Sequence, residues 1–288
     1  MKVLLGAHLY DADAAAAKRQ TDAARANAAL AGVDFLNVQP ARNPLQHEGI
    51  ETLAVLERDA RDLVGFHGRP TPIASDLCDA LAGAARRRGL RYFALINGDI
   101  IVSSQAIDRI VREGRDGYVF SRIDVDDSGR DLELMLYGVD LWAFDVDWWD
   151  AHRHRFRPYV VGGPCFDNVY TAIMLAHGNG FIENRVGEIR HVAHERAWAT
   201  GPYERYNFYL AALDAPYFSM WARYIGSLEA LRRGVSSAEQ EAAMQQRTFV
   251  RRQSPLASIW HAGRCARARW RYARDRARFT ATAVAAPR

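Results

Sequence analysis

The sequence predicts an α/β protein with a mostly parallel central sheet, flanking helices and a C-terminal helical extension. Three observations support this fold class. Short apolar runs alternate with helical patterns up to residue 123, as in a parallel sheet covered by helices on both faces. The first run, residues 3–8, is continuously apolar, as expected for a buried strand. Beyond residue 202 the pattern is helical.

The elements of the first half follow in order along the chain. The content of Ala, Arg and Gln over 11–31 predicts a helix, and Gly32 can end it. Apolar runs predict strands at 33–39 and 92–96, and the weak alternation over 51–56 fits either a third strand or a helix start. Two more helices and one strand complete this half, at 75–88, 103–112 and 117–123.

The second half loses this alternation. Its predicted elements are strands over 132–145, a helix over about 167–177, an extended segment over 181–191, helices over about 202–246 and a basic helix over 255–279. No linker-like composition separates the halves. We therefore predict one domain over 1–200 and a helical extension with a basic tail over 201–288.

Composition and charge narrow the functional classes. Hydrophobic residues make up 49% and charged residues 25%, which excludes wholesale disorder. The net charge of +4 is unevenly distributed: residues 247–288 hold eleven arginines and one acid. The other 246 residues hold 27 bases and 33 acids, and so carry a net charge of −6. This acidic body argues against a nucleic-acid-binding surface, and no DNA partner is expected.

The cysteines and the chain start indicate a cytoplasmic protein. Cys78, Cys165 and Cys265 are far apart and odd in number, which argues against a disulfide scaffold and a structural zinc site. The apolar run that follows Met1 is shorter than a signal peptide requires. The sequence contains no stretch of about 18 apolar residues, so no transmembrane helix is expected.

Polar residues follow the strand predicted at 92–96. Ligands of open α/β sheets bind at the carboxyl ends of the strands, where Asn97, Gly98 and Asp99 lie. A carboxylate and a carboxamide two residues apart can both face one Mn²⁺ or Mg²⁺ ion, whose shell diphosphate oxygens would complete. The alternative is an N-G-D turn that serves only backbone geometry.

Two further segments carry candidate chemistry, and a third, acidic segment does not. His191 and His194 could add ligands to a divalent ion, or be hydrogen-bonded structural histidines. Asp167 follows two glycines and begins a helix, where its ionised carboxylate could act as a general base or could simply cap the helix. The acidic run at 124–127 fits a solvated turn, because it lacks the spacing of a calcium loop.

Taken in order over roughly residues 1–200, these motifs resemble the GT-A-fold, Rossmann-like nucleotide-sugar glycosyltransferases, of the family 2-like kind. The resemblance is carried by the segment 70–76 entering a helix, Asn97-Gly98-Asp99 at the position of the D-x-D motif, the strand 137–144 on the acceptor side, and the glycine loop leading to Asp167. The sequence contains no G-x-S-x-G, Walker A or dinucleotide G-x-G-x-x-G motif. A serine hydrolase, a P-loop NTPase and a Rossmann oxidoreductase therefore lack sequence support.

The resemblance implies a metal site in a catalytic domain over 1–200. Asp99 would be the main ligand of Mn²⁺ or Mg²⁺, with Asn97 in place of the usual first aspartate. His191 or His194 would be the C-terminal metal-binding histidine. The loss of one carboxylate from the motif should weaken metal binding.

The resemblance also implies a reaction. The enzyme would transfer a sugar from a nucleoside-diphosphate donor to a hydroxyl of a glycan or glycolipid, with inversion and with Asp167 as the base, in building a cell-surface polysaccharide or glycolipid. Tyr10 and Asp76 are candidate nucleoside contacts. Two alternatives are a sugar-1-phosphate nucleotidyltransferase and a non-enzymatic RNA- or phosphate-binding protein that acts through the arginine-rich tail.

The tail, residues 255–288, interleaves aromatic residues with arginines. Such a helix could lie on an anionic membrane surface, which would place the protein at the inner membrane face. It could also bind nucleic-acid phosphates or pack on its own chain. Arginines fall on nearly every side of the expected helix, so the sequence alone shows no clean apolar face.

Overall fold

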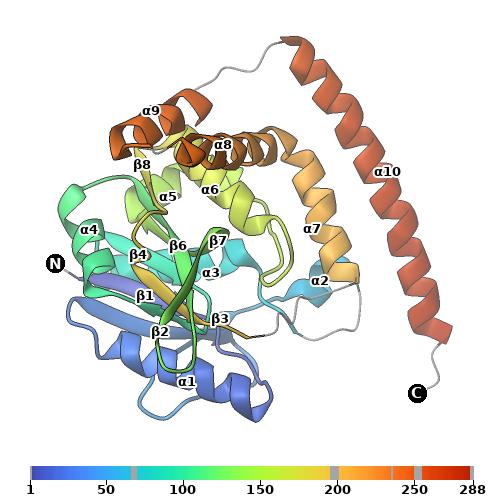
Figure 1. Ribbon diagram of the computed structural model, residues 1–288. Helices are drawn as coiled ribbons and strands as arrows, with labels where there is room; N and C mark the ends of the chain where they lie inside the picture. Colours follow the sequence, from blue (N-terminus) through green and yellow to red (C-terminus); the bar gives the residue numbers. More distant parts are fainter. Residues whose placement is uncertain (1, 66–69, 195–200, 235, 250–254, 286–288) are drawn as a thin grey trace. The chain divides into compact units, whose positions relative to one another are not determined.

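A computed structural model describes the backbone of residues 2–65, 70–194, 201–234, 236–249 and 255–285 (Figure 1). It confirms the α/β class: a nine-stranded sheet is flanked by helices. Five of the eight strand pairings are parallel, which confirms that the sheet is mostly parallel.

The sheet has the strand order β3-β2-β1-β4-β7-β6-β9-β5, and β8 also pairs with β6. The strands are β1 Val3–Ala7, β2 Val33–Pro40, β3 Thr52–Leu56, β4 Tyr92–Ile96, β5 Ile100–Val102, β6 Gly117–Val125, β7 Asp131–Asp145, β8 Gly180–Glu183 and β9 Ile189–Val192. The segment left open between strand and helix is therefore the strand β3. The strands predicted over 132–145 form one long strand, β7.

The helices are α1 Ala14–Ala28, α2 Ala60–Val64, α3 Ala74–Arg87, α4 Ser104–Glu113, α5 Val146–His152, α6 Phe166–His177, α7 Pro202–Leu213, α8 Ala215–Arg233, α9 Ala238–Phe249 and α10 Pro255–Ala285, with a 3₁₀ turn at Arg153–Arg155. The sequence prediction missed α2, α5 and β5. Helix α5 follows β7 without a break, and Asp145 caps it by accepting hydrogen bonds from the amides of Asp147 and Trp148.

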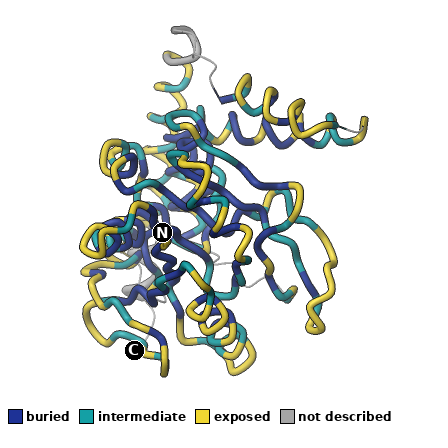
Figure 2. The backbone as a smooth tube through the Cα atoms, turned by 90° about the vertical axis from the view of Figure 1, so that its left-hand side faces the viewer, coloured by how far each residue is buried: buried dark blue, intermediate teal, exposed yellow. Residues whose placement is uncertain are grey.

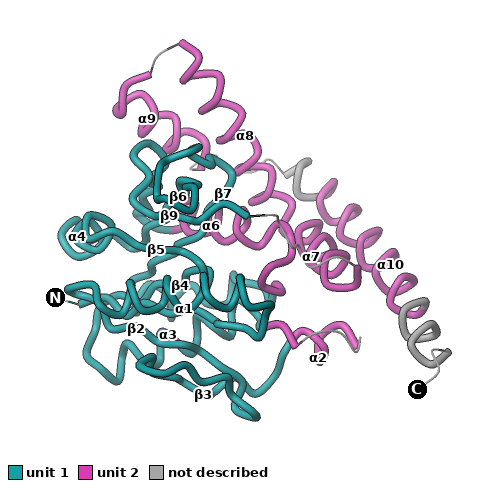
Figure 3. Tube along the Cα trace, turned by 60° about the horizontal axis from the view of Figure 1, so that its bottom comes forward, with its two compact units in different colours: residues 1–59, 72–158, 178–197 teal, residues 60–71, 159–177, 198–288 magenta. Residues whose placement is uncertain are grey.

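The backbone forms two compact units (Figure 3). The first unit comprises residues 1–59, 72–158 and 178–197 and contains the whole sheet. The second comprises 60–71, 159–177 and 198–288 and contains α2, α6 and α7 to α10. Helix α6 thus groups with the C-terminal helices, whereas the predicted division at residue 200 placed it with the sheet.

The core of the first unit explains why β1 is apolar throughout. Alternate residues of β1 point to opposite faces of the sheet. Val3 and Leu5 belong to a buried cluster with Ile107 and Ile110 of α4. On the other face, a Cβ at Gly6 would lie 2.2 Å from Leu81 of α3, so this strand position requires a residue without a side chain. Figure 2 colours the backbone by burial, and β1 and β4 are buried along their whole length.

A buried asparagine of α1 fixes β5, the short strand at the end of the sheet. Asn27 donates to the carbonyl of Ile100 at 2.7 Å and accepts from the amide of Val102 at 2.9 Å. Its side chain thus satisfies two backbone groups that lack a strand partner on that side. This anchor holds the backbone immediately after Asp99.

The second unit is a helical assembly with its own buried polar link. Asn207 of α7 is fully buried, and its amide group accepts from the Val160 amide at 2.9 Å and donates to the Val160 carbonyl at 2.8 Å. A Cβ at Gly163 would lie 2.5 Å from the Asn207 side chain. Gly163, in the glycine loop that leads to Asp167, is therefore required for this internal packing.

Candidate metal centre

The sheet topology brings three predicted site residues together. Asp99 follows β4 at the carboxyl end of the strand, as predicted. Strand β9 lies between β6 and β5, so His191 is paired with Ile100 on one side and with Asp124 on the other. His194 follows two residues after the end of β9. Segments far apart in the sequence therefore meet at one edge of the sheet.

The geometry of the cluster suits one bound cation. One ligand atom each from Asp99, His191 and His194 lies within 4.8 Å of the others. Asp99 Oδ2 is 3.1 Å from His194 Nε2 and 3.5 Å from His191 Nε2, and the two Nε2 atoms are 3.2 Å apart. Ligands bound to one ion at about 2.1 Å, at right or tetrahedral angles, are separated by about 3.0–3.4 Å.

Electrostatic interactions keep the Asp99 carboxyl group ionised. Burial alone would raise the pKa of the Asp99 carboxyl, but hydrogen bonds and charge from His191 and His194 hold that pKa well below its ordinary value. Burial lowers the pKa of His191, yet Asp99 and Asp124 outweigh it and raise the pKa overall. In the absence of a cation, the acid and the two imidazoles thus stabilise one another.

A second layer of residues orients the ligands. His191 Nδ1 lies 2.9 Å from Asp124 Oδ1, so the other ring nitrogen, Nε2, faces Asp99. Arg122 donates to Asp124 at 2.8 Å and to Asp140 at 2.7 Å. A carboxylate on the far nitrogen of a ligating histidine fixes its tautomer and ring orientation.

This second layer corrects the interpretation of the acidic run at 124–127. Asp126 does form a turn, accepting from the amides of Ser128 and Arg130. Asp124, however, lies on β6, and its side chain is only 17% exposed. Arg122 and Asp124 are two residues apart on β6 and therefore share one face of the strand. This spacing is the sequence signal that could have identified them as partners.

The remaining predicted residues of the first unit have structural contacts. Asn97 donates from its side chain to Asp140, which connects it to Arg122. Asp76 accepts two hydrogen bonds from Arg58, at 2.7 and 3.0 Å. The backbone amide of Tyr10 donates to Gln20 at 2.9 Å, and the tyrosine is 37% exposed. The nucleoside-binding roles of Tyr10 and Asp76 remain predictions.

Asp167 belongs to the second unit, in the first turn of α6. Its Oδ1 accepts from the amide of Asn168 at 2.8 Å, as an acid at a helix N-terminus can. Cys165, just before the helix, has a positive φ of 77°, which is unusual for a residue with a side chain. The role of Asp167 as a base stays a prediction.

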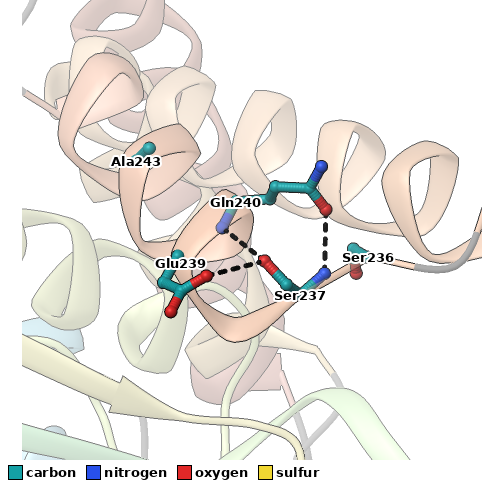
Figure 4. A pocket seen from close by; sticks show the side chains of 5 residues that line it. All are labelled: Ser236, Ser237, Glu239, Gln240 and Ala243. Carbon is teal, nitrogen blue, oxygen red and sulfur yellow. Dashed lines mark hydrogen bonds between the residues drawn. The ribbon is translucent and has the colours of Figure 1, made fainter.

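A surface hollow at the start of α9 has a structural explanation. It is lined by Ser236, Ser237, Glu239, Gln240 and Ala243 (Figure 4). Ser237 accepts from the Gln240 amide at 3.2 Å, while the Gln240 side chain accepts from the Ser237 amide at 2.8 Å. These reciprocal bonds form a capping box, so we assign the hollow to helix capping.

Replacing Asp124 with alanine is expected to weaken metal binding about 10–100-fold, because His191 loses the group that orients its ring. The measurement is a calorimetric titration of the purified protein with Mn²⁺. Asp127→Ala serves as the matched control, since Asp127 is an exposed acid of the same run. Equal Mn²⁺ affinity of the two variants would contradict the orienting role of Asp124.

Comparisons with known proteins found solved structures of low similarity. No family model matches the sequence, and no curated protein matches it. One similar solved structure is a glycosyltransferase involved in the glycosylation of the major capsid of PBCV-1, with a TM-score of 0.41 and 10% identity over 68% of this chain and 96% of that chain. Another is a cytidylyltransferase from Leptospira borgpetersenii serovar Hardjo-bovis (strain JB197), with a TM-score of 0.36 and 11% identity over 73% of this chain and 86% of that chain.

Proposed function

We propose that the chain is a metal-dependent glycosyltransferase that moves a sugar from a nucleoside-diphosphate donor to a hydroxyl of a glycan or glycolipid. The observation that carries this proposal is the cluster of Asp99, His191 and His194 at the carboxyl edge of the sheet. Ligands of open α/β sheets bind at that edge. A cation site there suits a substrate that carries a diphosphate.

The three candidate metal ligands favour Mn²⁺ over Mg²⁺. Two imidazoles and one carboxylate form a mixed shell, whereas Mg²⁺ prefers oxygen ligands and retains several waters. When bound, the cation would stabilise the negative charge of the departing nucleoside diphosphate. Asp99, His191 and His194 would hold the cation, and diphosphate oxygens of the substrate would complete its ligand shell.

The chain's own residues prepare this site. Asp99 stays ionised because two histidines face it. Asp124 holds the His191 ring, and Arg122 offsets the charges of Asp124 and Asp140, so that three acids can lie close together. Their preset positions reduce the reorganisation that the binding of a charged donor would require.

Asp167 is the proposed general base of an inverting transfer. Its place in the first turn of α6 stabilises the ionised form that can accept the acceptor hydroxyl proton. Asp167→Asn should lower the transfer rate about 100- to 10,000-fold while donor binding is retained. Full transfer activity in this variant would show that another group is the base.

The function is tested by thermal shift against nucleoside diphosphates and nucleotide sugars, each with and without Mn²⁺. We expect one nucleotide to raise the melting temperature only when Mn²⁺ is present, because ligands stabilise the folded state that binds them. Product analysis with that nucleotide sugar and hydroxyl acceptors then measures transfer. Formation of a nucleotide sugar from a nucleoside triphosphate and a sugar 1-phosphate would instead identify a nucleotidyltransferase.

A further inference from the structure

Helix α10 uses one face to pack within the second unit. Its half-buried residues recur every three or four positions and are His261, Cys265, Ala268, Tyr272 and Asp275. Tyr272 stacks on Tyr209 of α7, with ring centroids 4.6 Å apart and planes within 6°, and also contacts Tyr206. Figure 1 shows α10 running beside α7. The sequence-based alternative of packing on its own chain therefore describes this inward face.

The opposite face of α10 is apolar and exposed. Ile259 is 72% exposed and Trp270 is 64% exposed. The exposed residues Ala266, Ala273 and Ala277 continue the same stripe at helical spacing. Trp260, 68% exposed, lies at its border. A stripe of exposed apolar side chains on the face opposite the packed one is typical of a surface that interacts with a protein, a membrane or a ligand.

Arginines border this outward stripe on both sides. They are Arg264, Arg267, Arg271 and Arg274 along one border and Arg269 along the other, whereas Arg276 lies beside Gly65 of the same unit. Arg264 lies over the Trp260 ring at 5.8 Å, and Arg274 lies over the Trp270 ring at 5.2 Å. Asp275, the one acid of α10, is on the inward face near Arg205. Arginines that seemed scattered in the sequence thus leave the packed face free.

We propose that the outward face of α10 docks on an anionic phospholipid bilayer, with the helix lying in the plane of the surface. Tryptophans and an isoleucine would enter the headgroup region, while the arginine borders contact lipid phosphates. Among the described residues, no helix is long and apolar enough to cross a membrane, so docking would be peripheral.

The same observations disfavour other occupants. Trp260 and Trp270 already have Arg264 and Arg274 over their rings, and Ile259 and the alanines supply no further aromatic ring, so the face lacks a continuous surface on which successive bases could stack. A second copy of the same face would bring like-charged arginine borders together. A lipid surface accommodates both the apolar stripe and its cationic borders, because acyl chains lie directly beneath the phosphates.

The test is co-sedimentation of the full chain with vesicles of phosphatidylglycerol and phosphatidylcholine, compared with vesicles of phosphatidylcholine alone. We expect binding only to the anionic vesicles, weakening with added salt. Arg267→Gln combined with Arg274→Gln should weaken it about 30-fold, since each arginine near an anionic surface contributes about five-fold. Ile259→Ala combined with Trp270→Ala should weaken it as well.

The matched control is Arg25→Gln combined with Arg112→Gln, which removes the same charge from exposed positions of α1 and α4 and should leave vesicle binding unchanged. Melting temperatures show that each variant is folded. The proposal is overturned if the intact protein does not bind anionic vesicles, or if the α10 variants bind as well as the control. Binding to a single-stranded RNA oligonucleotide but not to vesicles, or a dimer that dissociates only in the α10 variants, would also overturn it.

Discussion

Asp99→Ala is expected to reduce metal-dependent transfer about 1,000-fold, because the loss of the anionic ligand removes several kcal/mol of stabilisation at the diphosphate. Under the proposed function, Mn²⁺ should raise the melting temperature of the intact protein but not that of this variant. Both effects follow from one observation: Asp99 supplies the only carboxylate within the described metal cluster. Initial rates and thermal shift, each over a range of Mn²⁺ concentrations, are the measurements.

Asp127→Ala is again the control, since this exposed acid has no part in the cluster. A melting temperature without metal close to that of the intact protein would show that Asp99→Ala is folded. If this variant retained both turnover and the Mn²⁺-dependent shift, the cluster would not be the catalytic metal site.

Arg122→Met is expected to lower the free energy of unfolding by about 3–5 kcal/mol, because two acids lose their shared partner. The Arg122 side chain is only 13% exposed, and the side chains of Asp124 and Asp140 are 17% and 6% exposed. Burial raises the pKa of Asp140 even with Arg122 beside it. Without Arg122 both carboxylates would lose their cationic partner in poorly hydrated surroundings, which is costly.

The control for this prediction is Arg190→Met. Arg190 pairs with Asp131 at 3.1 Å, but both side chains are about half exposed, so the loss should be below about 1 kcal/mol. Urea denaturation of both variants measures the difference. Similar losses in the two variants would mean that the Arg122 network contributes no more than a surface ion pair.

The metal cluster shows how far sequence patterns reach. Asp99 was predictable because a continuously apolar strand, 92–96, ends just before it and fixes its place at the sheet edge. His191 was only a candidate, because its contact with Asp99 depends on the pairing of β9 with both β5 and β6. A shift of one residue would turn His191 to the opposite face, and no local pattern specifies that register.

Asp124 shows where the patterns mislead. Acids clustered at the end of an apolar run look like a solvated turn, and Asp126 fulfils that expectation. The strand nevertheless continues to Val125, because β9 pairs with it there and supplies His191 as a partner for the charge. Burial by a segment distant in sequence, and not local propensity, decides the role of Asp124.

The position of β9 has a consequence for how the protein folds during synthesis. Strands β1 to β4 come from residues 3–96 and can associate as soon as that part of the chain is made. Strand β5, directly after Asp99, can bond with Asn27 of α1 early, but its strand partner in the described sheet is β9, so this pairing must wait for a late segment. A nascent chain that stops before residue 189 would therefore leave Asp99 without its histidines. Under the proposed function, metal affinity would report on completion of the sheet, and a bound cation would hold its early and late strands together.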